Sequence, residues 1–146
     1  MTKRRVVVTG IGMLSPLGNT VDETWNAILQ GQSGIGPITH FDPEFLSTRF
    51  AGEVKDFDPT EYIPRKDVKK MDRFIQLGIA AAKQSIADAE LTVDETNAHR
   101  IGVAIGSGIG GLQMIEENHT KLVNSGPKHV TAIFGKWANP NMKSGF

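Results

Sequence analysis

A glycine-rich hexapeptide is the segment of this sequence whose residue types and spacing most directly suggest chemistry. Gly106-Ser107-Gly108-Ile109-Gly110-Gly111 satisfies the pattern G-x-G-x-x-G between a predicted strand and a predicted helix. In that setting backbone amides can bind the pyrophosphate of a dinucleotide. Such a fold also needs an acidic residue about 20 positions further on for the ribose hydroxyls, and no Asp or Glu follows Glu117. A dinucleotide-binding domain that uses Gly106–Gly111 therefore stays as the weaker alternative, beside a plain tight turn.

Basic residues gather at the start of a predicted long helix. They are Arg65, Lys66, Lys69, Lys70 and Arg73. The last four have i, i+3, i+4 and i+7 spacing and would share one helix face. Composition alone favours a solvated face that Asp67 and Asp72 partly neutralise.

Several common kinds of catalytic centre are missing from the sequence. The chain has no cysteine, which excludes a disulfide, a thiolate metal site and a thiol nucleophile. Ser15 and Ser107 lack the G-x-S-x-G setting of a hydrolase. The histidines have no metal-binding spacing; they are His40, His99, His119 and His129. We therefore assign no catalytic residue, no metal site and no cofactor.

Composition indicates an ordinary globular chain. It has 146 residues, 39% of them hydrophobic and 22% charged, and a formal net charge of zero, so it can bury a core and its overall charge predicts neither a nucleic acid nor a membrane surface as partner. The valines after Lys3-Arg4-Arg5 resemble a signal peptide, but Gly10 and Pro16 interrupt the apolar run. We expect a cytoplasmic location by default.

The predicted elements alternate between strands and helices. A continuous β-branched run, Val6–Val8, predicts a strand buried on both faces. Thr20 and Glu23 form a capping box before a helix that ends at Gly31. Val21, Trp25, Ile28 and Leu29 fall on one face of that helix.

Further elements follow along the chain. They are an ordered, proline- and aromatic-rich excursion over Gly34–Pro64, a long helix over Arg65–Glu90, a buried strand over Arg100–Ile105 and a helix over Leu112–Val123. Small residues at Gly78, Ala81 and Ala82 would let another backbone approach the long helix. This alternation predicts an α/β layered fold with a largely parallel sheet.

The motifs of the chain closely resemble those of the β-ketoacyl-acyl-carrier-protein synthases, the condensing enzymes of fatty acid synthesis, and especially the elongating type II. The matching segments read R-R-V-V-V-T-G-I-G-M-L-S-P-L-G-N-T-V, F-A-G-E-V-K-D-F, R-K-x-x-K-K-M-D-R-F-I-Q, R-I-G-V-A-I-G-S-G-I-G-G and E-E-N-H-T. The resemblance implies the N-terminal part of a thiolase-like layered αβαβα fold. It covers residues 1–127, whereas residues 128–146 form a divergent basic tail that is a candidate for poor order.

The family's reaction follows from the same resemblance. It is the decarboxylative condensation of malonyl-acyl-carrier protein with an acyl chain, and it runs through a cysteine thioester and two histidines whose motifs are absent here. We therefore expect this chain, taken as a fragment, a frameshifted product or an internal deletion, to be inactive alone. A non-catalytic module that binds acyl carrier protein is the alternative.

The resemblance also assigns residues to partners. Ile109, with Gly108 and Gly110, corresponds to the mouth of the acyl pocket. Lys66, Lys69 and Lys70 correspond to positions that bind the acidic carrier protein and its phosphopantetheine arm, and Arg65 and Arg73 are lesser contributors. The resemblance also implies that the complete family enzyme is a homodimer.

Overall fold

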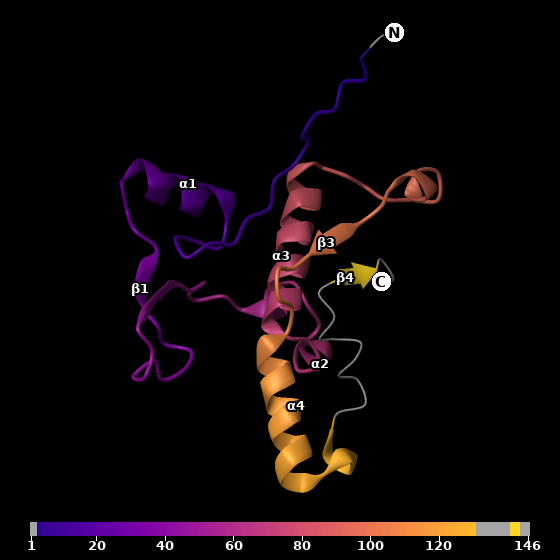
Figure 1. The fold of residues 1–146 in the computed structure, drawn as a ribbon. Helices are drawn as coiled ribbons and strands as arrows, with labels where there is room; N and C mark the ends of the chain where they lie inside the picture. Colours follow the sequence, from indigo (N-terminus) through magenta and orange to yellow (C-terminus); the bar gives the residue numbers. More distant parts are fainter. Residues whose placement is uncertain (1–2, 131–140, 144–146) are drawn as a thin grey trace. The chain divides into compact units, whose positions relative to one another are not determined.

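The structure is a computed structural model that describes residues 3–130 and 141–143. It divides into two compact units, residues 1–58 with 80–91 and residues 59–79 with 92–146. Helix α3 (Arg73–Asp88), labelled in Figure 1, contributes to both units. Its residues 73–79 belong to the second unit and its residues 80–88 to the first.

The first unit contains one further helix and a hairpin: α1 (Val21–Leu29), β1 (Ile35–Pro37) and β2 (Phe50–Gly52). The predicted cap of α1 is confirmed, since the Glu23 N–H donates to Thr20 Oγ1 at 3.2 Å. The Glu23 carboxylate accepts from the Asn19 N–H at 2.7 Å, one residue further back than the capping box predicts. The predicted left-handed end is also confirmed, because Gly31 has a φ of +67°.

The apolar face predicted for α1 is the exposed one. Trp25 and Leu29 are 57% and 67% exposed, whereas Thr24 and Ala27 are buried. The Thr24 hydroxyl lies 2.8 Å from the hydroxyl of Ser15, which holds the small-residue face of the helix against the chain before it. The large apolar side chains that share one face of the helix are therefore mostly exposed within this unit.

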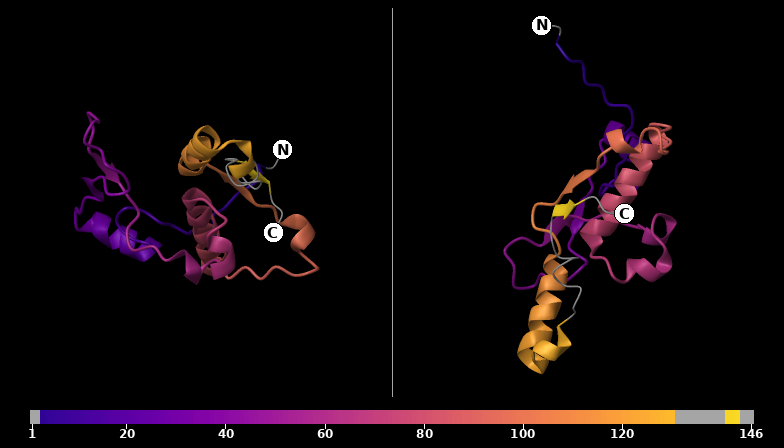
Figure 2. Two further views of the ribbon diagram at one scale, coloured as in Figure 1. Left: turned by 90° about the horizontal axis from the view of Figure 1, so that it is seen from below. Right: turned by 90° about the vertical axis from the view of Figure 1, so that its right-hand side faces the viewer.

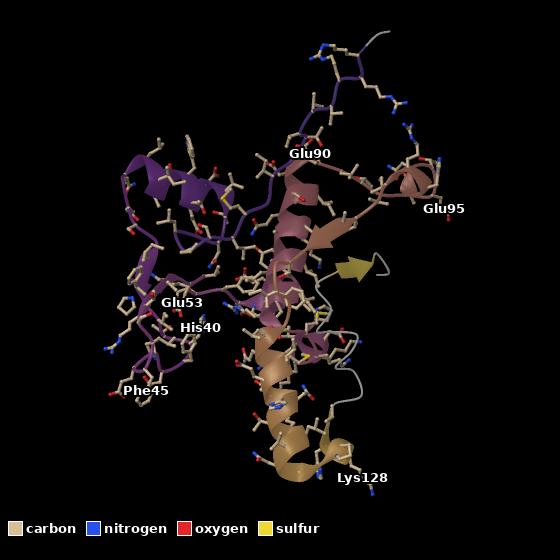
Figure 3. All side chains as sticks on the ribbon, in the orientation of Figure 1. His40, Phe45, Glu53, Glu90, Glu95 and Lys128 are labelled. Carbon is tan, nitrogen blue, oxygen red and sulfur yellow. The ribbon has the colours of Figure 1, made fainter. Side chains whose placement is uncertain are left out.

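The segment after α1 is ordered, as predicted. β1 and β2 pair antiparallel, with Ile35 opposite Gly52 and Pro37 opposite Phe50. Only part of the aromatic content is buried: Phe57 lies in the core, and Phe45 at the end of the hairpin loop is 94% exposed (Figure 3).

The predicted N-terminal strand does not form. Val6–Val8 pair with no strand in the part of the chain that the structure describes, and their exposures run from 66% to 92%. The residues that follow meet a helix instead: the Ile11 N–H donates to Asp88 at 2.8 Å and the Met13 N–H to Gln84 at 2.9 Å. Backbone amides that bond to the side chains of α3 are not available to a sheet ladder.

The second unit contains the remaining elements. They are η1 (Pro59–Glu61), α2 (Arg65–Val68), η2 (Ala98–Arg100), β3 (Ala104–Gly106), α4 (Leu112–Ser125), η3 (Pro127–His129) and β4 (Asn141–Lys143). The prediction of one helix over Arg65–Glu90 is wrong, because the chain turns between α2 and α3. The buried Gln76 amide donates to the carbonyls of Val68 at 3.1 Å and Met71 at 2.9 Å. These bonds stabilise the turn.

The second predicted strand is shorter and more exposed than expected. β3 pairs antiparallel with β4 (Figure 2). In this pair Ile105 lies opposite Met142. All strand pairs among residues 3–130 and 141–143 are antiparallel, so the largely parallel sheet is not present there. Ile105 lies against α3, where a β-carbon added to Gly78 would be 3.3 Å from its side chain.

The predicted tail is described only in part. Of residues 128–146, the segments 131–140 and 144–146 lie outside the described residues, and the others belong to η3, Val130 and β4. The boundary after Pro127 stays a prediction. Within the described ranges, no helix is both long and apolar enough to span a bilayer.

Candidate functional site

The predicted partner-binding residues lie on one short segment of the second unit, which we name the basic turn (residues 65–73). Arg65 and Lys66 belong to α2, Lys69 and Lys70 to the connection, and Arg73 begins α3. The first four are exposed and Arg73 is half-buried. The structure therefore brings the five together, but the break between the helices means that they do not share one continuous helix face.

An internal ion pair occupies one of these cations. Lys70 Nζ lies 2.8 Å from the Asp67 carboxylate. The hydrogen bond from Lys70 lowers the pKa of Asp67, so this carboxylate is charged over a wider pH range than usual. An acidic partner at Lys70 has to compete with Asp67.

The glycine-rich segment forms a compact loop, which we name the glycine loop (residues 106–111). The Gly110 N–H donates to the Ser107 hydroxyl at 3.2 Å, and Gly110 has a φ of +81°, a conformation that favours glycine. Ile109 is 69% exposed at the tip of the loop, next to the exposed Gly108. The loop thus presents an apolar side chain outward, and the assignment of Ile109 to the mouth of an acyl pocket stays a prediction.

The N-terminus of α4 is occupied by a carboxylate of the chain itself. Asp72 Oδ2 accepts the Met114 N–H at 3.3 Å. A β-carbon added to Gly111 would lie 2.6 Å from the same oxygen. A helix N-terminus that binds a pyrophosphate offers its free amides to the ligand, so the position of Asp72 argues against the dinucleotide alternative.

Asp72 is the residue of this site that sequence reasoning missed, because it was treated only as a neutralising charge. A signal was available. The residue before α4 is Gly111, which has no side chain to cap the helix, and the Met114 amide then needs an acceptor from elsewhere.

A groove of about 380 Å³ lies between the basic turn and α4. Val68, Met71 and Met114 contribute apolar surface to it. Its charged lining residues are Lys69, Arg73, Asp72 and Glu117, two of each sign. In the described ranges, no group of three or more His, Asp or Glu side chains is arranged to hold a metal ion. The groove is therefore lined by apolar surface and by charges of both signs, and the cations open to an acidic partner are the exposed ones of the basic turn.

Comparison with known proteins identifies the family. The family model described as "Beta-ketoacyl synthase, N-terminal domain" matches residues 3–146. The chain is 59% identical over 145 residues to the 3-oxoacyl-[acyl-carrier-protein] synthase 2 of Vibrio harveyi and 58% identical to that of Vibrio cholerae, covering 99% of this chain and 35% of each relative. It thus spans about a third of the length of these curated relatives.

Solved structures show the same similarity. The ishigamide ketosynthase/chain length factor matches with a TM-score of 0.75 at 31% identity, over 94% of this chain and 34% of that one. A β-ketoacyl synthase from Burkholderia phymatum gives 0.75 at 28%, over 94% and 34%. A ketosynthase complex with its type II PKS acyl-carrier protein gives 0.73 at 27%, over 94% and 36%. The predicted fold class, the N-terminal part of a thiolase-like α/β fold, is confirmed. The chain belongs to the β-ketoacyl synthase family and matches the N-terminal domain of that family.

Proposed function

We propose that this chain supplies the carrier-protein-binding surface and the acyl-pocket loop of a 3-oxoacyl-acyl-carrier-protein synthase of fatty acid elongation. The observation that carries the proposal is that the exposed basic turn and the glycine loop lie in one unit and meet at Asp72, which contacts the start of α4. The relatives named 3-oxoacyl-[acyl-carrier-protein] synthase 2 support the reaction type. The structure neighbour with a bound acyl-carrier protein supports the class of partner.

In this proposal the basic turn attracts the acidic carrier protein. Lys66, Lys69 and Lys70 provide most of the positive charge, and Arg65 and Arg73 add to it. Exposed cations of this kind chiefly raise the rate of encounter and orient the partner. The partner delivers acyl or malonyl groups on its phosphopantetheine arm.

The glycine loop borders the acyl chain in the same proposal. Ile109 provides apolar contact, and Gly108 and Gly110 leave room beside it. No residue of this chain can hold the acyl group as a thioester, because the sequence contains no cysteine. We therefore propose that the chain is inactive alone, that it has its place in a cytoplasmic homodimeric enzyme, and that neither nucleic acid nor membrane is a partner.

Binding of acyl carrier protein tests the proposal. The parent chain should bind saturably, and the affinity should fall as ionic strength rises because the screening length falls from ~10 Å at 0.1 M to ~3 Å at 1 M. Replacing Lys66, Lys69 and Lys70 by glutamate should abolish binding. A matched control replaces the exposed Lys3, Lys55 and Lys121 by glutamate; it makes the same change in net charge and should bind nearly as the parent does.

The outcomes separate the proposal from its alternatives. If both triple variants lose binding equally, the basic turn would act only through the overall charge of the chain and not as a specific binding surface. Carbon dioxide or ketoacyl product from the pure chain with acyl- and malonyl-carrier protein would contradict inactivity, whereas binding without product also fits a non-catalytic carrier-binding module. Saturable NAD or NADP binding that Gly108→Val removes would instead favour the dinucleotide reading.

A further inference from the structure

Asp72 contacts both parts of the candidate site. It follows the basic residue Lys70 by two positions, and its backbone carbonyl accepts the Ile75 N–H at 3.1 Å in the first turn of α3. Its side chain accepts the Met114 N–H of α4 at 3.3 Å. One residue therefore joins the segment that carries the lysines to the helix that follows the glycine loop.

The contact between Asp72 and α4 leaves no room for a side chain at Gly111, the last residue of the glycine loop. Gly111 is buried, and a β-carbon there would lie 2.6 Å from Asp72 Oδ2 and 3.2 Å from its Cγ. The φ of Gly111 is −86°, a value open to any residue. A β-carbon at this position would therefore displace the Asp72 carboxylate, whereas the backbone conformation itself does not call for glycine.

Buried amide side chains hold the backbone on both sides of the contact between Asp72 and Met114, in the basic turn and in the first turn of α4. Gln76, which is 9% exposed, donates to the carbonyls of Val68 and Met71 in the basic turn. Asn118, which is 4% exposed, donates to the Met114 carbonyl at 2.8 Å. Because neither end can easily relax by itself, a displacement of one should be transmitted to the other through Asp72.

We propose that Asp72 is a positioning residue that couples the basic turn to the glycine loop, so that partner binding at the turn and the conformation that presents Ile109 depend on each other. The coupling to a carrier protein rests on the function proposed above. Thermodynamic linkage makes it reciprocal: a partner that favours one arrangement of the turn favours the matching arrangement of the loop.

Amide hydrogen exchange on the full chain tests the coupling at saturating acyl carrier protein, where differences in affinity do not enter. In the parent, carrier protein should slow exchange at Met114 and in residues 108–111 by about fivefold or more, the lower end of usual coupling. In Asp72→Ala this change should vanish while slowed exchange in residues 65–70 persists. Equal slowing at the loop in Asp72→Ala and in the parent would overturn the proposal.

A second experiment needs no partner. Gly111→Ala should displace the Asp72 side chain and shift the amide resonances of Lys69, Lys70 and Met71. In the Asp72→Ala background the same substitution should leave these resonances unchanged. Gly102→Ala, at a glycine with open space around it, is the matched control and should have no effect in either background.

The two experiments also separate this inference from the proposed function. If carrier protein does not bind the parent, the proposed function fails. The comparison of Gly111→Ala with and without Asp72→Ala still tests the coupling, because it needs no partner. If Gly111→Ala unfolds the chain, adding Asp72→Ala should restore folding because the overlap is then gone. Two results would show that Asp72 does not couple the two segments. One is that Gly111→Ala with Asp72→Ala is as unfolded as Gly111→Ala alone, and the other is that Gly111→Ala leaves the basic-turn resonances unchanged.

Discussion

The Glu53 carboxylate accepts hydrogen bonds from both the backbone and the side chain of Thr39. It accepts the Thr39 N–H at 3.0 Å and the Thr39 hydroxyl at 2.7 Å, and it also accepts the His40 N–H at 3.3 Å. Glu53 directly follows β2, and Thr39 lies two residues after β1. One carboxylate thus holds together the two sides of the hairpin at the base of its loop.

This arrangement predicts that the hairpin loosens in acid. The Thr39 hydroxyl, and after it the Thr39 amide, lower the pKa of Glu53 from its ordinary value of 4.5. A carboxyl whose pKa is lower in the folded state stabilises that state fully above the unfolded-state value, and the contribution is lost as the pH falls through the folded-state value. Protection of the Thr39 and His40 amides should therefore be constant above pH 5 and should fall below about pH 4.5.

A variant without the charge isolates this effect. In Glu53→Gln, protection of the Thr39 and His40 amides should be several-fold lower at neutral pH and should lose its dependence on acid. Glu44→Gln removes an exposed carboxylate from the same hairpin loop and should change neither property. An acid transition at Thr39 that persists in Glu53→Gln would assign the effect to another group.

A different contact should limit substitution near the N-terminus. A β-carbon at Gly12 would overlap the Ala81 carbonyl of α3, and one at Gly10 would lie 2.6 Å from the Ala89 amide nitrogen. Gly12→Ala should therefore weaken this packing by about 1–3 kcal/mol, the usual cost of overpacking. Faster exchange of the Ile11 and Met13 amides would measure the change.

The control for this prediction is Gly36→Ala in β1. Its added β-carbon meets no atom within 4 Å, so exchange at Ile11 and Met13 should stay as in the parent. If Gly12→Ala also leaves these amides unchanged, the segment does not depend on close contact with α3.

Local signals predicted the helix ends and loops well, because they depend on residues close together in the chain. Thr20 caps α1 and Gly31 ends it as the sequence indicates, and α4 begins at Leu112 as expected. The break between α2 and α3 was not predictable from apolar spacing, since Gln76 stabilises it with hydrogen bonds from the following helix.

The prediction of a strand over Val6–Val8 failed for a related reason. A β-branched run such as Val6–Val8 favours a strand only where a partner strand pairs with it. In the described part of the chain the neighbouring amides bond to Gln84 and Asp88 of a helix, more than 70 residues away in sequence. Asp72 at α4 depends on a similarly distant contact, between positions 42 residues apart. Periodicity and capping rules do not contain such pairings.

Removing the ion pair in the basic turn should strengthen partner binding. Asp67→Asn frees Lys70, which is held at 2.8 Å by the Asp67 carboxylate, and also removes a like charge facing an acidic partner. We expect the affinity for acyl carrier protein to rise by about two- to fivefold at low salt, the range of exposed ion pairs, and the gain to disappear at high salt. Titration at two ionic strengths measures it.

Two further variants show whether Lys70 is the cause. Glu95→Gln removes one exposed negative charge elsewhere in the same unit and should give little or no gain. In a Lys70→Gln background, Asp67→Asn should lose most of its effect. An equal gain with Lys70 absent would mean that Asp67 acts by general repulsion and does not compete for the lysine.

The exposed apolar face of α1 should make the chain associate with itself. Trp25, Ile28 and Leu29 are each at least 50% exposed on this helix, and exposed patches of this kind mark interaction sites or aggregation liabilities. Sedimentation velocity at micromolar concentration should therefore show species larger than the monomer.

Two double variants test whether apolar contact causes this association. Ile28→Lys with Leu29→Lys should shift the distribution towards monomer. Asn26→Lys with Gln30→Lys should do so much less, although it adds the same charge at exposed polar positions of the helix and its cap. A parent chain that sediments as a single monomeric species, or equal effects of the two double variants, would show that apolar contact through α1 does not drive association.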